Sequence, residues 1–446
     1  MPVSTPVADV ARVPVLTSAL RKARWRLIPL LSVCYLVAYM DRINISFAAE
    51  SMNRDLHFTP KIYGLGAGLF FLTYALCEIP SNRLLLRFGA RRWMARIMLT
   101  WGLLAAAMIL VKTPRSFYGL RMLLGMAEAG YFPGALFYLS LWFPKRERAR
   151  AISLFYVALP ISTVVMGGLA GSLLRLNGRL GLMGWQWLFL VEALPAIALS
   201  VVVWFALPDG PSKARWLETE ERDALMTELR HAPPAGHVQS NAQDLRAALK
   251  SKYVWGFGLF FFCTLGSNYA VNFSLPILLK EATGWSPGRV GGLIAVVGLM
   301  GAASMIGNAV HSDRRGERMW HIVVPTLAMA FGLLAAGLHM GGWFAVGALA
   351  FAAVTNYAIQ GPMLSVCSMV LPGDAAAVGI ATINMCAIAG GFVGPYWMGW
   401  MREATGTYAV GIGGLFVPCL LAGLSILWLL PRWNAAMRRL ELPAGE

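Results

Sequence analysis

Twelve long apolar runs divide this 446-residue chain. A helix needs about 20 consecutive, mostly apolar residues to cross a bilayer core about 30 Å thick. Only 13% of the residues are charged, compared with about 25% in ordinary soluble domains. The runs therefore predict an all-α membrane protein, embedded in a lipid bilayer, with twelve transmembrane helices at 27–49, 62–84, 94–112, 115–142, 151–174, 186–207, 253–279, 288–310, 321–339, 343–370, 376–401 and 409–431.

The net charge of +16 is distributed unevenly along the chain. The two tails and every second connection contain 26 Lys and Arg residues, and the remaining connections contain 9. Because positive charge gathers on the cytoplasmic side of membrane proteins, this pattern predicts a multi-pass protein of the bacterial inner membrane with both termini in the cytoplasm. The basic segments lack the interleaved aromatic residues that stack on bases, which argues against a nucleic-acid partner.

The second half of the chain repeats the first. An R-x-G-x-R-x-W pattern occurs twice, 227 residues apart, at Arg87, Gly89, Arg91 and Trp93 and at Arg314, Gly316, Arg318 and Trp320. The loops at Pro144 and Pro372 are separated by nearly the same interval. Parallel six-helix repeats are typical of secondary transporters. We therefore expect two six-helix bundles (27–207 and 253–431), a cytoplasmic linker (208–252) and cytoplasmic tails (1–26 and 432–446).

Four ionisable residues lie at bilayer depth in the predicted spans: Asp41, Arg42, Arg121 and Glu128. Such a residue costs about 2.5 to 3.5 kcal/mol in a spanning helix unless it has a partner or a water-filled cavity. Arg121 and Glu128 are seven residues apart and share a helix face, whereas Asp41 and Arg42 diverge by about 100°. These four residues are the strongest candidates for a functional site.

The four residues are formally neutral together. Protonation of Asp41 or Glu128 would leave a net positive charge, and Arg42 could then hold a carboxylate through a two-pronged contact. Loss of the proton would restore neutrality and weaken the contact, which gives a physical basis for coupling a proton to an anion. The alternative is an ion-pair network that only holds two helices together.

Other polar residues inside the spans are weaker candidates for substrate contacts. Each could instead form hydrogen bonds between helices. The residues that we assign to the substrate site besides Arg42 are Tyr39, Tyr74, Asn268, Asn272, Gln360 and Asn384. Tyr269 belongs to the same class, whereas Glu78 and Glu192 are expected to be structural because they lie nearer the span ends.

Motifs of enzymes and of metal sites are absent from the sequence. There is no HExxH, no GxSxG with a plausible triad and no GxxxxGK[ST] nucleotide loop. The six cysteines lie in apolar runs without a CxxC pair, so no metal site is predicted. We expect no enzymatic activity and no cofactor, with the proton as coupling ion.

Several segments resemble the major facilitator superfamily and, within it, the anion:cation symporter family. They are YMDRINIS (39–46), EIPSNRLLLRFGARRW (78–93), GMAEAGYFPGALFYLSLWFPKRERARA (125–151), SDRRGERMWH (312–321) and GIATINMCAIAGGFVGPYWMGW (379–400). The last two are most similar to the tartrate and phthalate permease branch. The resemblance covers nearly the whole chain and implies a monomer that works by rocker-switch alternating access.

The resemblance also implies roles for individual residues. Asp41, Glu128 and Arg121 would take part in proton coupling, with Arg121 as a charge partner, and Arg42 would bind substrate. The implied gating loops contain Arg87, Gly89, Arg91, Asp313, Arg314 and Gly316. The chain departs from the superfamily pattern at Leu86, where an acidic residue usually precedes the arginine, and a gating salt bridge in the first half is therefore in doubt.

These observations together predict a proton-coupled symporter that imports a small organic anion, such as a tartrate-like dicarboxylate, a sugar acid or an aromatic carboxylate. An exporter or exchanger with the same fold is the alternative within transport. A non-transporting membrane sensor is the alternative from another class, and it would need an effector domain that the predicted tails (1–26 and 432–446) do not supply.

Overall fold

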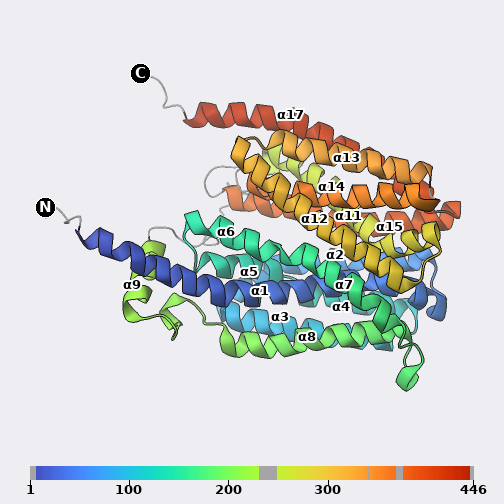
Figure 1. Cartoon of the computed structure of the whole chain (residues 1–446), viewed down its shortest axis with the longest axis horizontal. Helices are drawn as coiled ribbons and strands as arrows, with labels where there is room; N and C mark the ends of the chain where they lie inside the picture. The colour runs from blue at the N-terminus through green and yellow to red at the C-terminus, as the bar shows by residue number, and fades with distance from the viewer. Residues whose placement is uncertain (1–6, 231–248, 340, 368–374, 442–446) are drawn as a thin grey trace.

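The computed structural model describes residues 7–230, 249–339, 341–367 and 375–441. Within these ranges the secondary structure consists of helices and connections, without strands. The long helices run side by side, and both chain termini lie at the same end of the molecule (Figure 1). We call this the terminal end and the opposite end the far end. The loop at Pro372, part of the predicted repeat, lies outside the described residues.

The first half contains six helical passages, two of which are broken. Its helices are α1 (Val7–Leu56), α2 (Pro60–Phe88), α3 (Ala90–Ala107) with a 3₁₀ turn (Met108–Leu110), α4 (Pro114–Glu128) with α5 (Tyr131–Ser140), α6 (Lys145–Tyr156) with α7 (Ala158–Leu174), and α8 (Gly184–Ala206). A second 3₁₀ turn (Arg179–Gly181) precedes α8.

The second half repeats this arrangement after a short helix. A 3₁₀ turn (Pro211–Lys213) and α9 (Thr219–Arg230) follow α8. The remaining helices are α11 (Lys252–Thr283), α12 (Pro287–Arg315), α13 (Met319–Leu338), α14 (Gly342–Cys367), α15 (Ala375–Thr405), and α16 (Ala409–Gly414) with α17 (Phe416–Glu441). Ten described stretches are long and apolar enough to cross a membrane. The fourth and eleventh predicted spans are not among these ten stretches; the fourth corresponds to α4 with α5, and the eleventh corresponds to α15.

The helix ends follow from local sequence. Thr59 caps α2 by accepting a hydrogen bond from the Ile62 N–H, and Pro60 occupies the first helical position, where no N–H is needed. Gly89 ends α2 with a φ of +87°, and Gly316 ends α12 with a φ of +62°. Both conformations favour glycine because it has no Cβ. The two glycines of the repeated sequence pattern therefore end corresponding helices in the two halves, each with a positive φ.

A break between α4 and α5 fixes the position of Glu128. The break occurs at Ala129 and Gly130, and Gly130 adopts a left-handed φ of +88°. The freed carbonyl of Ala129 accepts a hydrogen bond of 2.6 Å from the Ser81 hydroxyl, which in turn accepts one of 3.0 Å from the Trp93 indole N–H. Side chains of α2 and α3 thus replace the lost helical bonds, as a buried backbone requires, and Glu128 is the last residue of α4.

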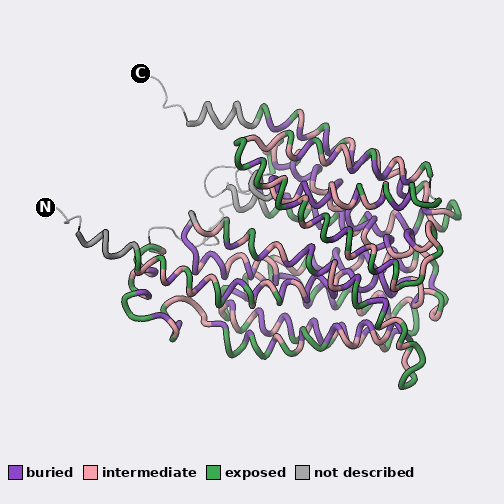
Figure 2. The backbone as a smooth tube through the Cα atoms, in the orientation of Figure 1, coloured by how far each residue is buried: buried purple, intermediate pink, exposed green. Residues whose placement is uncertain are grey.

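Close contacts join the two halves along helix pairs. α2 packs against α15, α7 against α12, and α1 against α11. A Cβ added to Gly171 would lie 2.4 Å from the Gly288 Cα, and one added to Gly167 would lie 2.5 Å from the Gly291 carbonyl oxygen. Small residues allow helix backbones to approach in this way inside a membrane. Buried residues line the interior of the bundle, while outward faces are exposed (Figure 2).

Polar contacts at the terminal end tie α1 to α9. The predicted tail (1–26) is helical from Val7 onward and continuous with the first span. Lys22 pairs with Glu218 and Glu221 at 3.1 and 2.8 Å, and the Ser18 hydroxyl donates to Glu221 at 2.8 Å. We refer to Ser18, Lys22, Glu218 and Glu221 as the α1–α9 clamp. It stabilises a helix that extends beyond the apolar run.

Candidate functional site

Two adjacent residues of α1 face different parts of the bundle. Arg42 forms an ion pair with Glu128 of α4, whereas the Asp41 carboxylate accepts a hydrogen bond of 3.2 Å from the Asn44 amide on its own helix. The offset of about 100° between successive helical residues produces this divergence. The structure therefore brings Arg42 and Glu128 together, whereas Asp41 forms its hydrogen bond within its own helix and interacts with Glu128 only through charge at longer range.

The Arg42 guanidinium lies where α1, α2, α4 and α11 meet. Its Nη1 donates a hydrogen bond of 3.3 Å to the Tyr269 hydroxyl of α11, in the second half. Its Cζ lies 5.3 Å from the ring centroid of Tyr74 and 5.5 Å from that of Phe70, within the range of cation–π attraction. Arg42 thus contacts residues from both halves.

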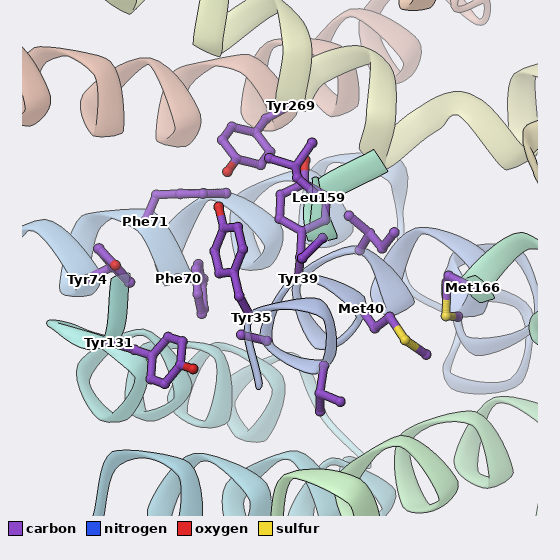
Figure 3. Close-up of a cluster of buried hydrophobic side chains, with 14 of the residues drawn as sticks. Tyr35, Tyr39, Met40, Phe70, Phe71, Tyr74, Tyr131, Leu159, Met166 and Tyr269 are labelled. Atoms are coloured by element: carbon purple, nitrogen blue, oxygen red, sulfur yellow. The ribbon is translucent and has the colours of Figure 1, made fainter. Parts of the chain in front are cut away.

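Aromatic residues form the surroundings of this contact. Phe71 packs against Tyr269 with a centroid distance of 4.3 Å. Tyr35, Tyr39, Tyr74 and Tyr269 gather around the same region between the halves (Figure 3). Tyr39 itself is buried. The hydroxyl groups and ring faces give this region both hydrogen-bonding capacity and apolar surface.

The two members of the ion pair differ in exposure. The Arg42 side chain is 14% exposed, and that of Glu128 is 2% exposed. Among the described residues, no hydrogen-bond partner reaches the buried Oε2 atom of Glu128. A buried carboxylate with incomplete hydrogen bonding loses much of its hydration without full compensation. Arg42 is therefore the more accessible member of the pair. The ionised form of Glu128 is stabilised mainly by its contact with Arg42.

The contacts of Arg121 differ from the predicted role of this residue as a charge partner. Its Nε and Nη2 donate to the carbonyls of Gly66 and Ala67 on α2, both at 3.3 Å. Its Cζ lies 4.8 Å from the Phe70 ring centroid. Within the described ranges, no carboxylate lies within ion-pair distance of Arg121. These contacts attach α4 to α2, and Arg121 acts on Asp41 and Glu128 only through its charge at longer range.

A second buried acid lies near Asp41. Glu192 of α8 is 4% exposed, and its two carboxylate oxygens have no hydrogen-bond partner among the described residues. It is close enough to Asp41 for the two charges to interact. The sequence predicted a structural residue near a span end, but Glu192 lies in the interior of α8, eight residues after its start. Asp41 and Glu192 therefore form a second acidic environment.

A polar contact between the halves lies one helical turn beyond Tyr74. The Asn384 amide of α15 donates to both carboxylate oxygens of Glu78 on α2, at 2.8 and 3.1 Å. The sequence analysis assigned Asn384 to the substrate site and treated Glu78 as structural. In the structure Glu78 is inside α2, ten residues before its end. The sequence contains a sign of this position that was not used: Glu78 follows Tyr74 by four residues, so the two side chains share one helix face.

The remaining predicted substrate residues form a separate group in the second half. The Asn272 side-chain amide donates to the side-chain oxygen Oδ1 of Asn268 at 2.9 Å, and both residues line a small crevice with Asn356 and Tyr357. The Tyr357 hydroxyl lies 3.0 Å from that of Thr163 on α7. Gln360 is half-buried one turn further along α14. Among the described residues, none of this group has an observed hydrogen bond to Arg42.

The predicted gating residues make local contacts at the terminal end. Arg91 approaches Asp209, beyond α8, with an Nε–Oδ1 distance of 3.4 Å. Asp313 approaches Arg318 at 3.6 Å, and the Arg87 guanidinium lies over the Phe88 ring. Arg314 is exposed. Asp209 thus supplies an acid to the first loop where Leu86 offers none.

No group of three or more His, Cys, Asp or Glu residues in the described ranges could hold a metal ion. The chemical content of the site is therefore two acid environments, an accessible guanidinium and a polar contact between the halves. Such an arrangement can exchange protons and bind an anion.

Comparison with known proteins places these features in a family. The model of the Major Facilitator Superfamily matches residues 31–395. An Agrobacterium vitis protein named "Putative tartrate transporter" is 43% identical over 411 residues, covering 92% of this chain and 93% of that protein. The inner membrane transport protein RhmT of Escherichia coli is 33% identical over 383 residues, covering 85% and 88%.

Solved structures have the same fold. The inward open form of the xylose transporter XylE from Escherichia coli superimposes with a TM-score of 0.74 at 16% identity, covering 92% of this chain and 96% of that one. A bacterial homologue of the human lysosomal transporter Spinster gives a TM-score of 0.70 at 17% identity, covering 92% and 95%. The chain is thus a membrane-embedded, multi-pass transporter of a small molecule, and it belongs to the major facilitator superfamily.

Proposed function

We propose that this protein is a proton-coupled symporter that imports a small organic anion by alternating access. The candidate substrates are tartrate-like dicarboxylates, sugar acids and aromatic carboxylates. In this proposal the protein works as a monomer in the bacterial inner membrane with both termini in the cytoplasm. The observation that carries the proposal is the ion pair between Arg42 and Glu128 at the meeting point of the two halves.

Competition for one guanidinium couples the proton to the anion. When Glu128 is ionised, its carboxylate occupies Arg42. When Glu128 takes up a proton, its charge is lost and the guanidinium becomes available. A substrate carboxylate then binds Arg42 by charge-assisted hydrogen bonds. Departure of the proton restores the ion pair and expels the substrate, so that anion and proton cross together.

Contacts from both halves make binding sensitive to the conformational change. Arg42 lies in the first half, and Tyr269, which accepts its hydrogen bond, lies in the second. A ligand held between them would be released as the halves move apart, because only an interaction that differs between two states can shift their populations. Asp41 is in this proposal a second proton-binding group, buried beside Asn44 and Glu192.

The substrate class follows from a guanidinium surrounded by aromatic rings. A carboxylate would pair with Arg42, while Tyr39, Tyr74 and Asn384 would contact hydroxyl groups or apolar parts of the molecule. The name of the Agrobacterium vitis relative agrees with a hydroxylated dicarboxylate. A second relative, NicT of Pseudomonas putida, is named only as a metabolite transport protein and is 38% identical over 414 residues.

Transport into proteoliposomes tests the proposal. Purified protein is first screened by thermal shift against tartrate, galactonate and phthalate, because a ligand that binds only the folded state raises the melting temperature. Uptake of the best ligand is then measured with an inward proton gradient. We expect accumulation above the external concentration, and its collapse when a protonophore is added. Equilibration without accumulation under the gradient would contradict proton coupling.

Export or exchange is the second candidate function. The specific observation in its favour is a relative from Acinetobacter baumannii named "Quinolone resistance transporter", 38% identical over 415 residues. Preloaded vesicles distinguish the two directions. An exporter releases the loaded compound when the proton gradient points against its movement, whereas an exchanger releases it only when a second anion is present outside.

A further inference from the structure

A strongly basic pocket lies at the terminal end, outside the site between the halves. The chain that follows α8 folds back against the start of α3 and borders an open pocket of about 750 Å³. The ionisable residues that line it are Arg91, Arg92, Lys213, Arg215, Arg222 and Asp209. Five cations thus surround one carboxylate. The positive-inside pattern accounts for the side of the membrane on which these cations lie, but not for their grouping around one pocket.

The cations divide into bound and free groups. Asp209 approaches Arg91 at 3.4 Å and Lys213 at 3.3 Å, and Arg222 donates to the carbonyls of Ala214 and Leu217 at 3.3 and 3.2 Å. Arg92 and Arg215 are exposed, and in the described part of the chain no carboxylate lies within ion-pair distance of either. These two guanidiniums are therefore available to an anion.

The wall of the pocket is held in place by packed residues. Trp216 stacks on Trp142 of the first half, with a centroid distance of 5.3 Å and an interplanar angle of 13°. The Arg26 guanidinium lies over the Trp216 ring, 5.2 Å from its centroid. Ala214 and Leu217 are both buried. The segment that carries Arg215 is thus anchored on both sides, which fixes the position of a free cation.

The pocket opens beside the lipid-facing surface. Phe205, in the last turn of α8, lines the pocket and is 79% exposed, and its neighbour Trp204 is 44% exposed. Aromatic residues at the end of a spanning helix lie at the level of the lipid headgroups. The pocket therefore combines free guanidiniums with an exposed apolar wall at the membrane surface.

We propose that this pocket binds the phosphodiester headgroup of an anionic phospholipid. Arg92 and Arg215 contact the phosphate oxygens, because the planar guanidinium matches phosphate geometry. The acyl chains lie along Phe205 and the outer face of α8. A free phosphate ion would use the cations but not the apolar wall, so the combination favours a lipid. Basic clusters next to spanning helices attract anionic lipids in this way.

Lipid titration of the purified, full-length protein tests the proposal. Dioctanoyl phosphatidylglycerol, dioctanoyl phosphatidylcholine and inorganic phosphate are compared by thermal shift, and retained lipids are counted by native mass spectrometry. We expect stabilisation by phosphatidylglycerol alone. The double variant Arg92→Gln/Arg215→Gln should bind this lipid about 30-fold more weakly.

A matched variant removes the same charge elsewhere at the terminal end. Lys252, the first residue of α11, and Lys250, two residues before it, are exposed cations next to this spanning helix. Lys250→Gln/Lys252→Gln should keep the wild-type affinity for phosphatidylglycerol. Equal weakening in both double variants would overturn the proposal, since it would indicate a general effect of surface charge. Equal stabilisation by inorganic phosphate would overturn the assignment to a lipid.

Discussion

Asn384 on α15 donates hydrogen bonds to both carboxylate oxygens of Glu78 on α2, at 2.8 and 3.1 Å. The contact links the two halves, because α2 belongs to the first and α15 to the second. In a rocker-switch cycle these helices change their relative tilt. The contact is therefore expected to contribute differently to the two end states of transport.

Reversal of the donor and acceptor tests this contact. In Asn384→Asp two carboxylates would face each other, and we expect a loss of about 1–2 kcal/mol from the broken charge-assisted hydrogen bonds. The double variant Glu78→Gln/Asn384→Asp supplies a donor on the other side and should recover most of the melting temperature. If the double variant is as impaired as the single one, the contact has no role in linking the halves.

Arg42→Lys tests the requirement for a guanidinium. Lysine keeps the positive charge beside Glu128 but cannot form two parallel hydrogen bonds with a carboxylate. We expect the affinity for the anion to fall about 100-fold, which corresponds to roughly 2.7 kcal/mol. The measurement is the ligand concentration that gives half of the maximal thermal shift. Arg83→Lys, a change at an exposed arginine of α2, should leave this concentration unchanged, and a wild-type value for Arg42→Lys would remove the proposed contact.

Glu128→Gln separates binding from coupling. Glutamine resembles the protonated acid, so Arg42 is permanently released from its partner and remains able to bind an anion. We expect exchange of labelled for unlabelled anion to continue, while accumulation driven by a proton gradient falls to the level of a gradient-free control. Both activities are measured in the same proteoliposome preparation. Parallel loss of exchange and accumulation would instead indicate that Glu128 is needed only for stability.

The sequence predicted much of this site because the relevant rules are local. The 100° offset of successive helical residues was sufficient to separate Asp41 from Arg42. The repeated pattern indicated that Gly89 and Gly316 occupy corresponding positions in the two halves, and the structure gives both a positive φ. The twelve apolar runs and the family resemblance were also sufficient for the fold, which the family match confirms.

Contacts between distant helices could not be predicted in the same way. Arg42 and Glu128 are 86 residues apart in sequence. The break beside Glu128 at Gly130 was not predicted, because a glycine within an apolar run does not distinguish a break from close packing. The predicted span 62–84 is shorter than α2, which reaches Phe88. Glu78 was therefore placed too near a span end, and its contact with Asn384 was missed.

Two adjacent glycines of α7 provide a test of packing between the halves. A Cβ at Gly167 would lie 2.5 Å from the Gly291 carbonyl oxygen, whereas one at Gly168 would meet nothing within 4 Å. We expect Gly167→Ala to disfavour the close approach of α7 and α12 by about 1–3 kcal/mol, the usual penalty of overpacking. The initial uptake rate should fall several-fold in Gly167→Ala and stay unchanged in Gly168→Ala. Equal rates in the two variants would show that α7 and α12 need not approach this closely.

The α1–α9 clamp makes a pH-dependent contribution to stability. Burial favours the neutral form of Glu221, but hydrogen bonds from Lys22 and Ser18 outweigh this effect and lower the pKa of Glu221 below its usual value of 4.5. A group whose pKa is lower in the folded state stabilises the protein above its unfolded pKa and loses this effect as the pH falls through the folded pKa.

Glu221→Gln should therefore reduce the melting temperature at pH 7 by an amount equivalent to about 1 kcal/mol, the size of a charge-assisted contact near a surface. The difference from the wild type should shrink as the pH is lowered below about 4.5, because protonation removes the same charge from the wild-type protein. Glu220→Gln changes an exposed neighbour on the same helix and should match the wild type at both pH values. A Glu221→Gln deficit that stays constant down to pH 3.5 would mean that the clamp is stabilised by packing rather than by charge.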